Sequence, residues 1–180
     1  MPNYGFTAGV PDLDYSKNPR QPDTNNYLAN NFFKLEFTRL PTVTYFCQQV
    51  NLPSLTYDAV NFPTTLGIPH VAPGGRFTYD DLVVQFIVDE DMKNWIEVYE
   101  WMQSIGVLND INDTIPHNDK FSNVKLTVMN SAYNPNLQIT FYDVFPIGLS
   151  GIEFNSSLPD TIPIVASATF DFNYYKIKTL

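Results

Sequence analysis

The sequence has very little cysteine and no long hydrophobic run. Cys47 is the single cysteine in 180 residues, so the chain can form no internal disulfide and suits a reducing compartment. No window approaches the roughly 18 uncharged apolar residues of a membrane span. The N-terminus has neither the basic start nor the apolar core of a signal peptide. We therefore expect a soluble protein with no membrane partner.

Positive charge is also scarce. There are 10 Lys and Arg residues against 19 Asp and Glu residues, a formal net charge of −9 with neutral histidines. Because phosphate contacts need clustered cations, this balance argues against a general binder of the DNA backbone or of anionic membranes. Hydrophobic residues make up 44% of the chain and aromatic residues 15%. This is ample for the core of one folded domain, which at this length needs neither a metal nor a disulfide.

Patterns for catalysis and metal binding are missing as well. Cys47 could pair as a nucleophile only with His70 or His117, but it lies in an apolar run where a free cysteine packs as a small hydrophobe. The two histidines lack a clustered third zinc ligand. Residues 109–113 lack the glycine and the glutamate of a calcium loop, and Gly74-Gly75 does not precede a helix that could bind phosphate. We expect no enzyme activity, no metal and no cofactor.

The chain is predicted to divide into an extended N-terminal arm, residues 1–28, and a single β-sandwich domain, residues 29–180. The arm contains four prolines and shows no sustained hydrophobic period. It is either disordered or a strap that becomes ordered on a neighbouring subunit. As a strap, it would use the aromatic anchors Tyr4, Phe6 and Tyr15.

Alternation of apolar and polar residues predicts strands through most of the domain. Phe33, Leu35 and Phe37 alternate with polar neighbours, as in a strand with one buried face, and Pro41 is expected to end that run. A second type of run, residues 81–89, is apolar on both faces and is expected to be central. The remaining predicted strands span residues 42–51, 55–62, 123–130, 136–145 and 162–177. Together they indicate a mainly β protein, an antiparallel β-sandwich or barrel of about seven strands.

Residues 63–75 are predicted to form a long loop. Three prolines and three glycines in thirteen positions leave too few donors, and too many breakers, for a helix or a strand. Within this loop Leu66, Ile68 and Val71 are apolar, whereas a solvated loop favours polar residues. We predict that these three residues, with Tyr4 and Phe6 of the arm, form an inter-subunit interface.

One flanking α-helix is predicted over Asp91 to Ile105. Its apolar residues recur at helical spacing and are expected to face the core, with Lys93, Glu97 and Glu100 facing outward. The predicted core stripe is Trp95, Ile96, Tyr99 and Met102. Asp89 or Asp91 is expected to cap the start of the helix, and Gly106 to end it in a left-handed conformation.

Four segments, taken in their order along the chain, carry a likeness to a known family. They are the opening strand at residues 31–37, the strand end and proline turn at 47–55, the strand and acidic turn at 77–91 that run directly into the helix from Met92, and the aromatic strand at 168–175. In this order the chain resembles the major tail tube protein family of contractile-tailed bacteriophages over about residues 31–178. The order and lengths of the elements, and not one motif, carry the resemblance.

The resemblance implies a structural subunit that assembles into hexameric rings, stacked as a tube inside a contractile sheath. The implied partners are other copies of the chain, the tail sheath protein, baseplate and tube-terminator proteins, the tape-measure protein, and DNA in transit without specific binding. The implied location is the virion tail, after synthesis in the host cytoplasm. Three alternatives stay open: a tube initiator or terminator, a secretion-system tube homologue, or a ligand-binding β-sandwich that uses exposed Tyr and Trp.

The inner wall of such a tube is expected to be polar, without a net positive field that would hold DNA. Residues that alternate with the apolar set of each strand face away from the core and are the candidates for this wall. The predicted lumen-facing residues, all opposite an apolar face, are Glu36 beside Lys34, Lys125, Thr127, Gln138, Thr140, Asp171 and Asn173.

Overall fold

The computed structural model describes residues 27–62, 70–106, 116, 120–157 and 162–180. Most of the predicted arm therefore lies outside the described residues. Within them the chain forms nine strands and two helices, which confirms a mainly β antiparallel fold with more elements than predicted. The elements are β1 Phe33–Phe37, α1 Pro41–Phe46, β2 Cys47–Val50, β3 Leu55–Phe62, β4 His70–Tyr79, β5 Leu82–Ile87, α2 Lys93–Ile105, β6 Ser122–Met129, β7 Pro135–Leu149, β8 Val165–Asp171 and β9 Tyr174–Thr179.

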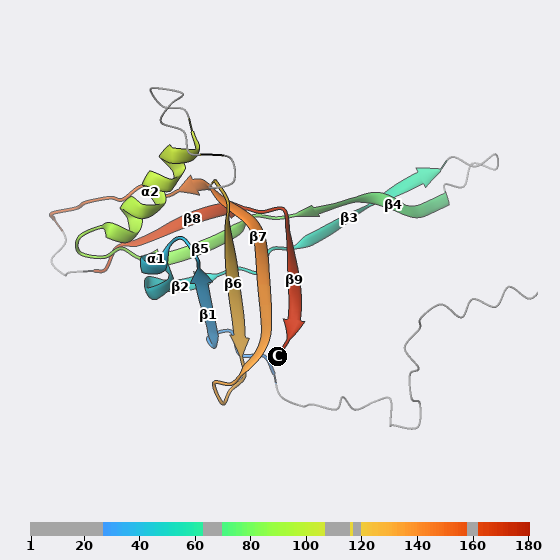
Figure 1. The fold of residues 1–180 in the computed structure, drawn as a ribbon, viewed down its shortest axis with the longest axis horizontal. Coiled ribbons are helices and arrows are strands. Elements are labelled where there is room, and N and C mark those ends of the chain that lie inside the picture. The colour runs from blue at the N-terminus through green and yellow to red at the C-terminus, as the bar shows by residue number, and fades with distance from the viewer. Residues whose placement is uncertain (1–26, 63–69, 107–115, 117–119, 158–161) are drawn as a thin grey trace, which may run out of the picture.

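Seven strands form one bent antiparallel sheet. Its order is β1-β6-β7-β8-β5-β2, with β9 paired to β7 beside β8. The 15-residue strand β7 belongs to both halves, because its first part pairs with β6 and β9 and its last part pairs with β8. Figure 1 shows β1, β6 and β9 running steeply, while β5 and β8 lie across them. Asp143, at φ 56°, lies where β7 passes from one half to the other.

The core fills the space between the two halves of the sheet. Alternate residues of β5 and β8 are buried, and the rings of Phe37, Trp101 and Phe170 gather near α2, with centroids 5.1 Å apart for Phe37–Phe170 and 6.1 Å for Trp101–Phe170. A second group, Phe141 and Phe172, packs edge to face at 5.1 Å. Burial of this apolar surface is the main stabilising term of the fold. No helix in the described ranges is long and apolar enough to span a bilayer.

The predicted strand over residues 42–51 is wrong in its first half. Residues 41–46 form α1, and only residues 47–50 form a strand, β2. Pro41 lies in the first turn of α1, where its missing N–H leaves no helical hydrogen bond unmade. Burial of Val43 in the core outweighs the strand preference of the surrounding β-branched residues.

The start and the end of α2 differ from the prediction. Met92, at φ 56°, precedes the helix, and no side chain caps it; Asp91 instead forms an ion pair with Lys93 at 2.6 Å. The fully buried Asn94 holds the turn, because its Nδ2 donates to the carbonyl oxygen of Ile87 at 2.7 Å. Gly106 is extended, at φ −84° and ψ 160°, so the expected left-handed stop is wrong.

The core-facing side of α2 also differs from the predicted stripe. Asn94, Val98 and Trp101 are the buried residues of the helix, whereas Ile96 and Tyr99 are 40% and 43% exposed. The helix is therefore rotated from the predicted stripe. The remaining stripe residues, Trp95 and Met102, are half-buried against the core, and Glu97 accepts a hydrogen bond from Thr42 of α1 instead of facing solvent.

Candidate functional site

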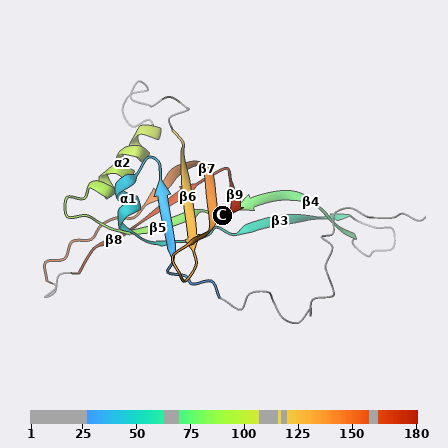
Figure 2. The same cartoon turned by 60° about the horizontal axis from the view of Figure 1, so that its bottom comes forward.

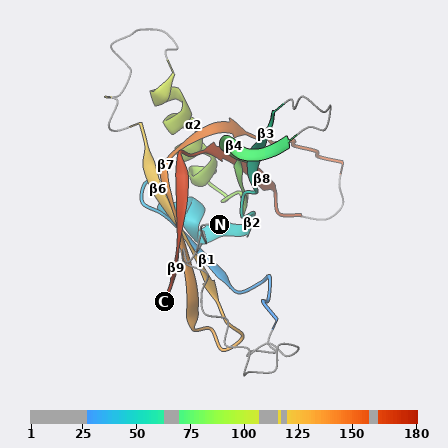
Figure 3. The same cartoon turned by 90° about the vertical axis from the view of Figure 1, so that its right-hand side faces the viewer.

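The clearest candidate surface is the hairpin formed by β3 and β4. These two strands pair with each other and form a sheet separate from the main one. Figure 2 shows the hairpin extending away from the body, and Figure 3, viewed from its end, shows it lying apart from β6 and β9. A two-stranded hairpin alone in water is marginally stable at best. Its base packs on the body through Tyr79, which contacts Phe172 and Tyr175, and we expect another surface to cover the rest of the hairpin.

The hairpin exposes large apolar side chains to water, which is unfavourable. Leu55 and Tyr57 are directly opposite Tyr79 and Phe77, so these four side chains share one face. Tyr57 is 43% exposed and Phe77 is 59% exposed, with their ring centroids 4.6 Å apart. Exposed, mutually contacting aromatic side chains are typical of protein interfaces.

Part of the predicted interface loop is a strand in the structure. Residues 70–75 belong to β4, so the prediction of a loop over 63–75 is wrong there, and Val71 lies in a strand opposite Asn61. Val71 is exposed, as an interface residue would be in a single chain. The other predicted interface residues, Tyr4, Phe6, Leu66 and Ile68, lie outside the described residues.

Gly75 allows the two strands to approach closely at an irregular point of the hairpin. A Cβ atom there would lie 2.0 Å from the backbone oxygen of Asp58, whereas at Gly74 it would lie 3.4 Å from Cγ2 of Val60, an ordinary contact. We expect Gly75→Ala to distort the hairpin and speed hydrogen exchange of its amides, with global unfolding unchanged. Gly74→Ala is the matched control, and equal exchange in the two variants would contradict this assignment.

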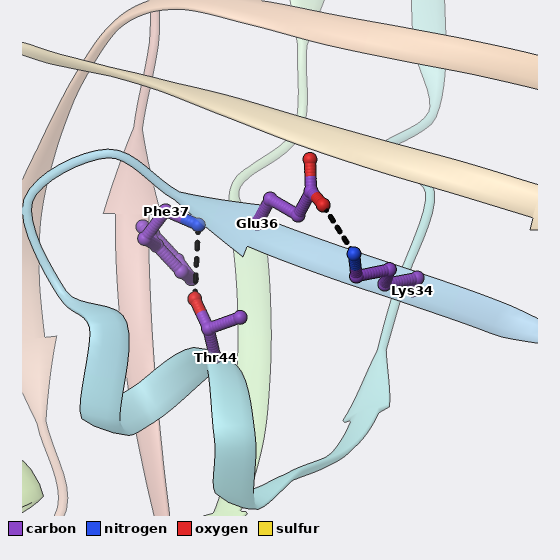
Figure 4. A network of polar contacts seen from close by, with 4 residues as sticks. All are labelled: Lys34, Glu36, Phe37 and Thr44. Carbon is purple, nitrogen blue, oxygen red and sulfur yellow. Dashed lines mark hydrogen bonds and ion pairs between the residues drawn. The ribbon is translucent and has the colours of Figure 1, made fainter.

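A lysine-rich surface covers the outer side of β1, β6, β7 and β9. In register across these strands lie the rows Glu36, Lys125, Thr140, Lys176 and Lys34, Thr127, Gln138, Lys178. Lys34 and Glu36 form an ion pair at 2.6 Å, seen in Figure 4. We call this the lysine face. It bears four of the ten Lys and Arg residues of the chain but only one carboxylate in these rows.

The lysine face contains most of the residues predicted to line the lumen. Five of the seven predicted lumen residues do share this face: Glu36, Lys125, Thr127, Gln138 and Thr140. Lys34, predicted beside Glu36, also lies on this face, and Lys176 and Lys178 of β9 join them, so the face carries a net positive charge. Alternation along each strand predicts correctly which residues share a side of that strand. The lysines of β9 are assigned to the lysine face only by the pairing of β9 with β7.

The other two predicted lumen residues lie elsewhere. Asp171 is exposed at the end of β8, and Asn173 lies in the turn to β9, where its Nδ2 donates to the carboxylate of Asp143 at 2.9 Å. Asp171 continues the outer side of β2, β5 and β8, where Gln49, Gln85 and Ser167 are directly opposite one another. We call this the glutamine face. The strands β2, β5 and β8 contain no Lys or Arg.

An apolar hollow near the start of α2 was not predicted. Its volume is about 220 Å³, and it is lined by Asp89 and Glu90 together with the apolar residues Val88, Met92, Ile152, Phe154 and Ile164. Phe154 is 77% exposed. Little in the sequence indicates this hollow, because Ile152, Phe154 and Ile164 lie in irregular stretches without a helical or strand period.

Cys47 has the environment of a packing residue. Burial raises the pKa of the Cys47 thiol to about 11, although a hydrogen bond to the backbone of Gln49 opposes this shift. The thiol is therefore protonated at neutral pH and a poor nucleophile.

Comparisons with known proteins agree with this architecture. A family model described as phage tail tube protein matches residues 20–178. The tail tube terminator protein of Enterobacteria phage T4 is 32% identical over 136 residues, which are 73% of this chain and 76% of that protein.

Two solved structures share the fold at low sequence identity. The tube-terminating cap of the anti-feeding prophage has a TM-score of 0.67 at 15% identity, with 92% of this chain and 99% of that chain covered. A chain of the extended sheath–tube complex of the extracellular contractile injection system PVC has a TM-score of 0.65 at 14% identity, with 87% and 95% covered. By the family match and the T4 relative, which span most of the sequence, the chain belongs to the phage tail tube protein family and is a structural protein of the virion tail.

Proposed function

We propose that this chain is the subunit of a tail tube terminator. Copies of the chain would form a ring that binds the last ring of the tail tube and stops growth of the tube. The observation that carries the proposal is the 32% identity to the T4 tail tube terminator over most of both chains. The major tube subunit, which the sequence alone favoured, is less well supported than the terminator named among its alternatives. The ring is proposed to be hexameric.

A terminator needs one surface that fits the tube and must not offer the same fit on its other side. The β3–β4 hairpin supplies a surface of this kind, because it extends from the body with Leu55, Tyr57 and Phe77 exposed. Covering these apolar groups on the last tube ring would stabilise the complex by the hydrophobic effect. We assign the hairpin to the contact with the tube.

The glutamine face is assigned to the lumen of the ring. DNA must slide through the lumen, and a wall that neutralises phosphates would retain it. Among the residues of β2, β5 and β8, the glutamine face is uncharged apart from Asp171, and its polar residues lie beside Val83, Ile87 and Val165. These strands therefore have no cation that would hold DNA, whereas the lysine face has four lysines. The lysine face is therefore directed away from the lumen, where neighbouring chains with a net charge of −9 complement it. Tape-measure and sheath proteins remain proposed partners.

Adding positive charge to the glutamine face should make the ring retain DNA. We expect rings of Gln85→Lys with Ser167→Lys to hold open-ended duplex DNA at low salt and release it as salt rises, because each added cation releases about one counterion from the duplex. Duplex blocked at both ends by a bulky protein cannot thread and should not be retained. Equal binding of open and blocked duplex would contradict the lumen assignment. Thr127→Lys with Thr140→Lys is the matched control on the lysine face.

The oligomeric form of the purified protein tests the terminator proposal. We expect native mass spectrometry to find closed rings of six chains, and electron microscopy to show separate rings at concentrations where a tube subunit polymerises. Long filaments of this chain alone would contradict a terminator and favour a tube subunit.

A further inference from the structure

Most of one backbone edge of strand β1 is unpaired among the described residues. Met129 N–H donates to the Phe32 carbonyl at 2.9 Å, and Thr38 N–H donates to the Asn123 carbonyl at 3.4 Å, so the even-numbered residues of β1 pair with β6. The odd-numbered residues turn their N–H and C=O groups the other way. Among the described residues, no partner is found on that side for the backbone of Phe33 or Leu35.

In the part of the chain that the structure describes, this edge is closed at its end. The Phe37 N–H donates to Oγ1 of Thr44 in α1 at 3.0 Å, as Figure 4 shows, and Thr44 in turn donates to the Leu40 carbonyl. The hydroxyl of Thr44 thus takes the position that a neighbouring strand would take. Toward the start of β1, no described residue covers Phe33 or Leu35 in the same way.

A groove runs beside the open part of this edge. Its volume is about 450 Å³, and it is lined by residues of β1 together with Thr44, Tyr45, Cys47 and Gln48. Natural proteins protect open edges with charges, prolines or bulges. β1 has no proline and no bulge, and its two charged residues, Lys34 and Glu36, form an ion pair with each other on the lysine face. The edge is therefore suited to receive an added strand.

The first residues of the chain have the pattern of such a strand. Tyr4, Phe6, Ala8 and Val10 alternate with Gly5, Thr7 and Gly9. This is the period of a strand with one apolar face. The seven residues are enough to cover the five residues of β1.

We propose that residues 4–10 of one copy add a strand to the open edge of β1 in a second copy and so link neighbouring subunits. This inference rests on the proposed ring. Residues 11–26 connect the added strand to the domain and contain Pro11, Pro19 and Pro22. At about 3.1 Å per residue in an extended conformation, 16 residues can span roughly 50 Å, which is far enough to reach the β1 edge of a second copy.

Hydrogen exchange of single amides in the assembled ring tests the pairing. We expect the Phe33 and Leu35 amides to be protected in the ring, and Phe6→Pro, which removes a donor from the added strand, to speed their exchange at least tenfold. Tyr15→Pro, in the linker, is the control and should leave both amides protected. Intact rings in which both amides exchange as fast as unpaired groups would overturn the inference while leaving the terminator proposal standing. Failure of the wild-type chain to form rings would instead count against the proposed function.

A disulfide trap identifies the copy that supplies the strand, even if Phe6→Pro fails to assemble. In a Cys47→Ser background, chains with Phe6→Cys or Ala8→Cys are mixed with chains carrying Phe33→Cys and are oxidised. We expect one of the two mixtures to give disulfides between different chains, and Tyr15→Cys to give none. If chains carrying both cysteines close the disulfide only within themselves, a second copy does not supply the strand and the inference fails.

Discussion

Replacing Trp101 by alanine should lower the free energy of unfolding by about 3–5 kcal/mol, the range for truncating a buried aromatic residue. Trp101 is 2% exposed, and its ring packs near Phe170 in the core. Its Nε1 donates to the Lys120 carbonyl at 3.1 Å, and the Arg39 guanidinium lies 5.1 Å from the ring centroid. The substitution thus removes core packing, a partly buried hydrogen bond and one of the three buried residues that attach α2 to the core. Equilibrium denaturation monitored by circular dichroism measures the loss.

Trp95→Ala is the matched control, because it removes the same side chain from the same helix. Trp95 is half-buried and stacks on the exposed Tyr99 ring at 5.5 Å. Its truncation should therefore cost distinctly less stability than that of Trp101. An equal or larger loss at Trp95 would show that the helix presents the originally predicted stripe to the core.

Replacing Tyr57 and Phe77 together by serine should abolish binding to the tube end while leaving the domain folded. The two rings contact each other on the exposed face of the hairpin, and the hairpin is not part of the main sheet. The loss of two aromatic anchors at an interface commonly weakens binding by a factor of a thousand or more, at about 2 kcal/mol or more for each hot-spot residue. Capping of purified tubes, followed by electron microscopy, measures the effect.

The control for this pair lies on the other side of the same two strands. Thr56 is directly opposite Thr78, and both residues alternate with the aromatic pair. Thr56→Ser with Thr78→Ser should leave tube capping unchanged. If the Tyr57/Phe77 variant caps tubes as well as the wild-type chain does, the hairpin is not the tube-binding surface.

Local patterns were sufficient for those strands whose two faces differ in burial. Phe33, Leu35 and Phe37 predicted β1 correctly, and the run at residues 81–89 predicted the central strand β5. The failure at residues 41–46 has a physical cause: Pro41 is compatible with either the end of a strand or the first turn of a helix. Tertiary burial of Val43 decided between them.

The rotation of α2 could not be read from hydrophobic spacing alone. Asn94, Val98 and Trp101 also recur at helical spacing, but a buried asparagine does not register as a core residue until its partner, the Ile87 carbonyl, is known. The division of the predicted lumen set has a similar cause. Alternation assigns a residue to one side of its own strand, whereas the register between β6, β7 and β9 brings the lysines together.

The position of this chain in a complete tail tests the central claim most directly. Tails assembled with a labelled copy of this chain can be imaged by electron microscopy and the label located along the tube. The terminator proposal predicts label at one end of each tube, in an amount equal to one ring. Label distributed along the length of the tube would contradict it and identify the chain as a tube subunit.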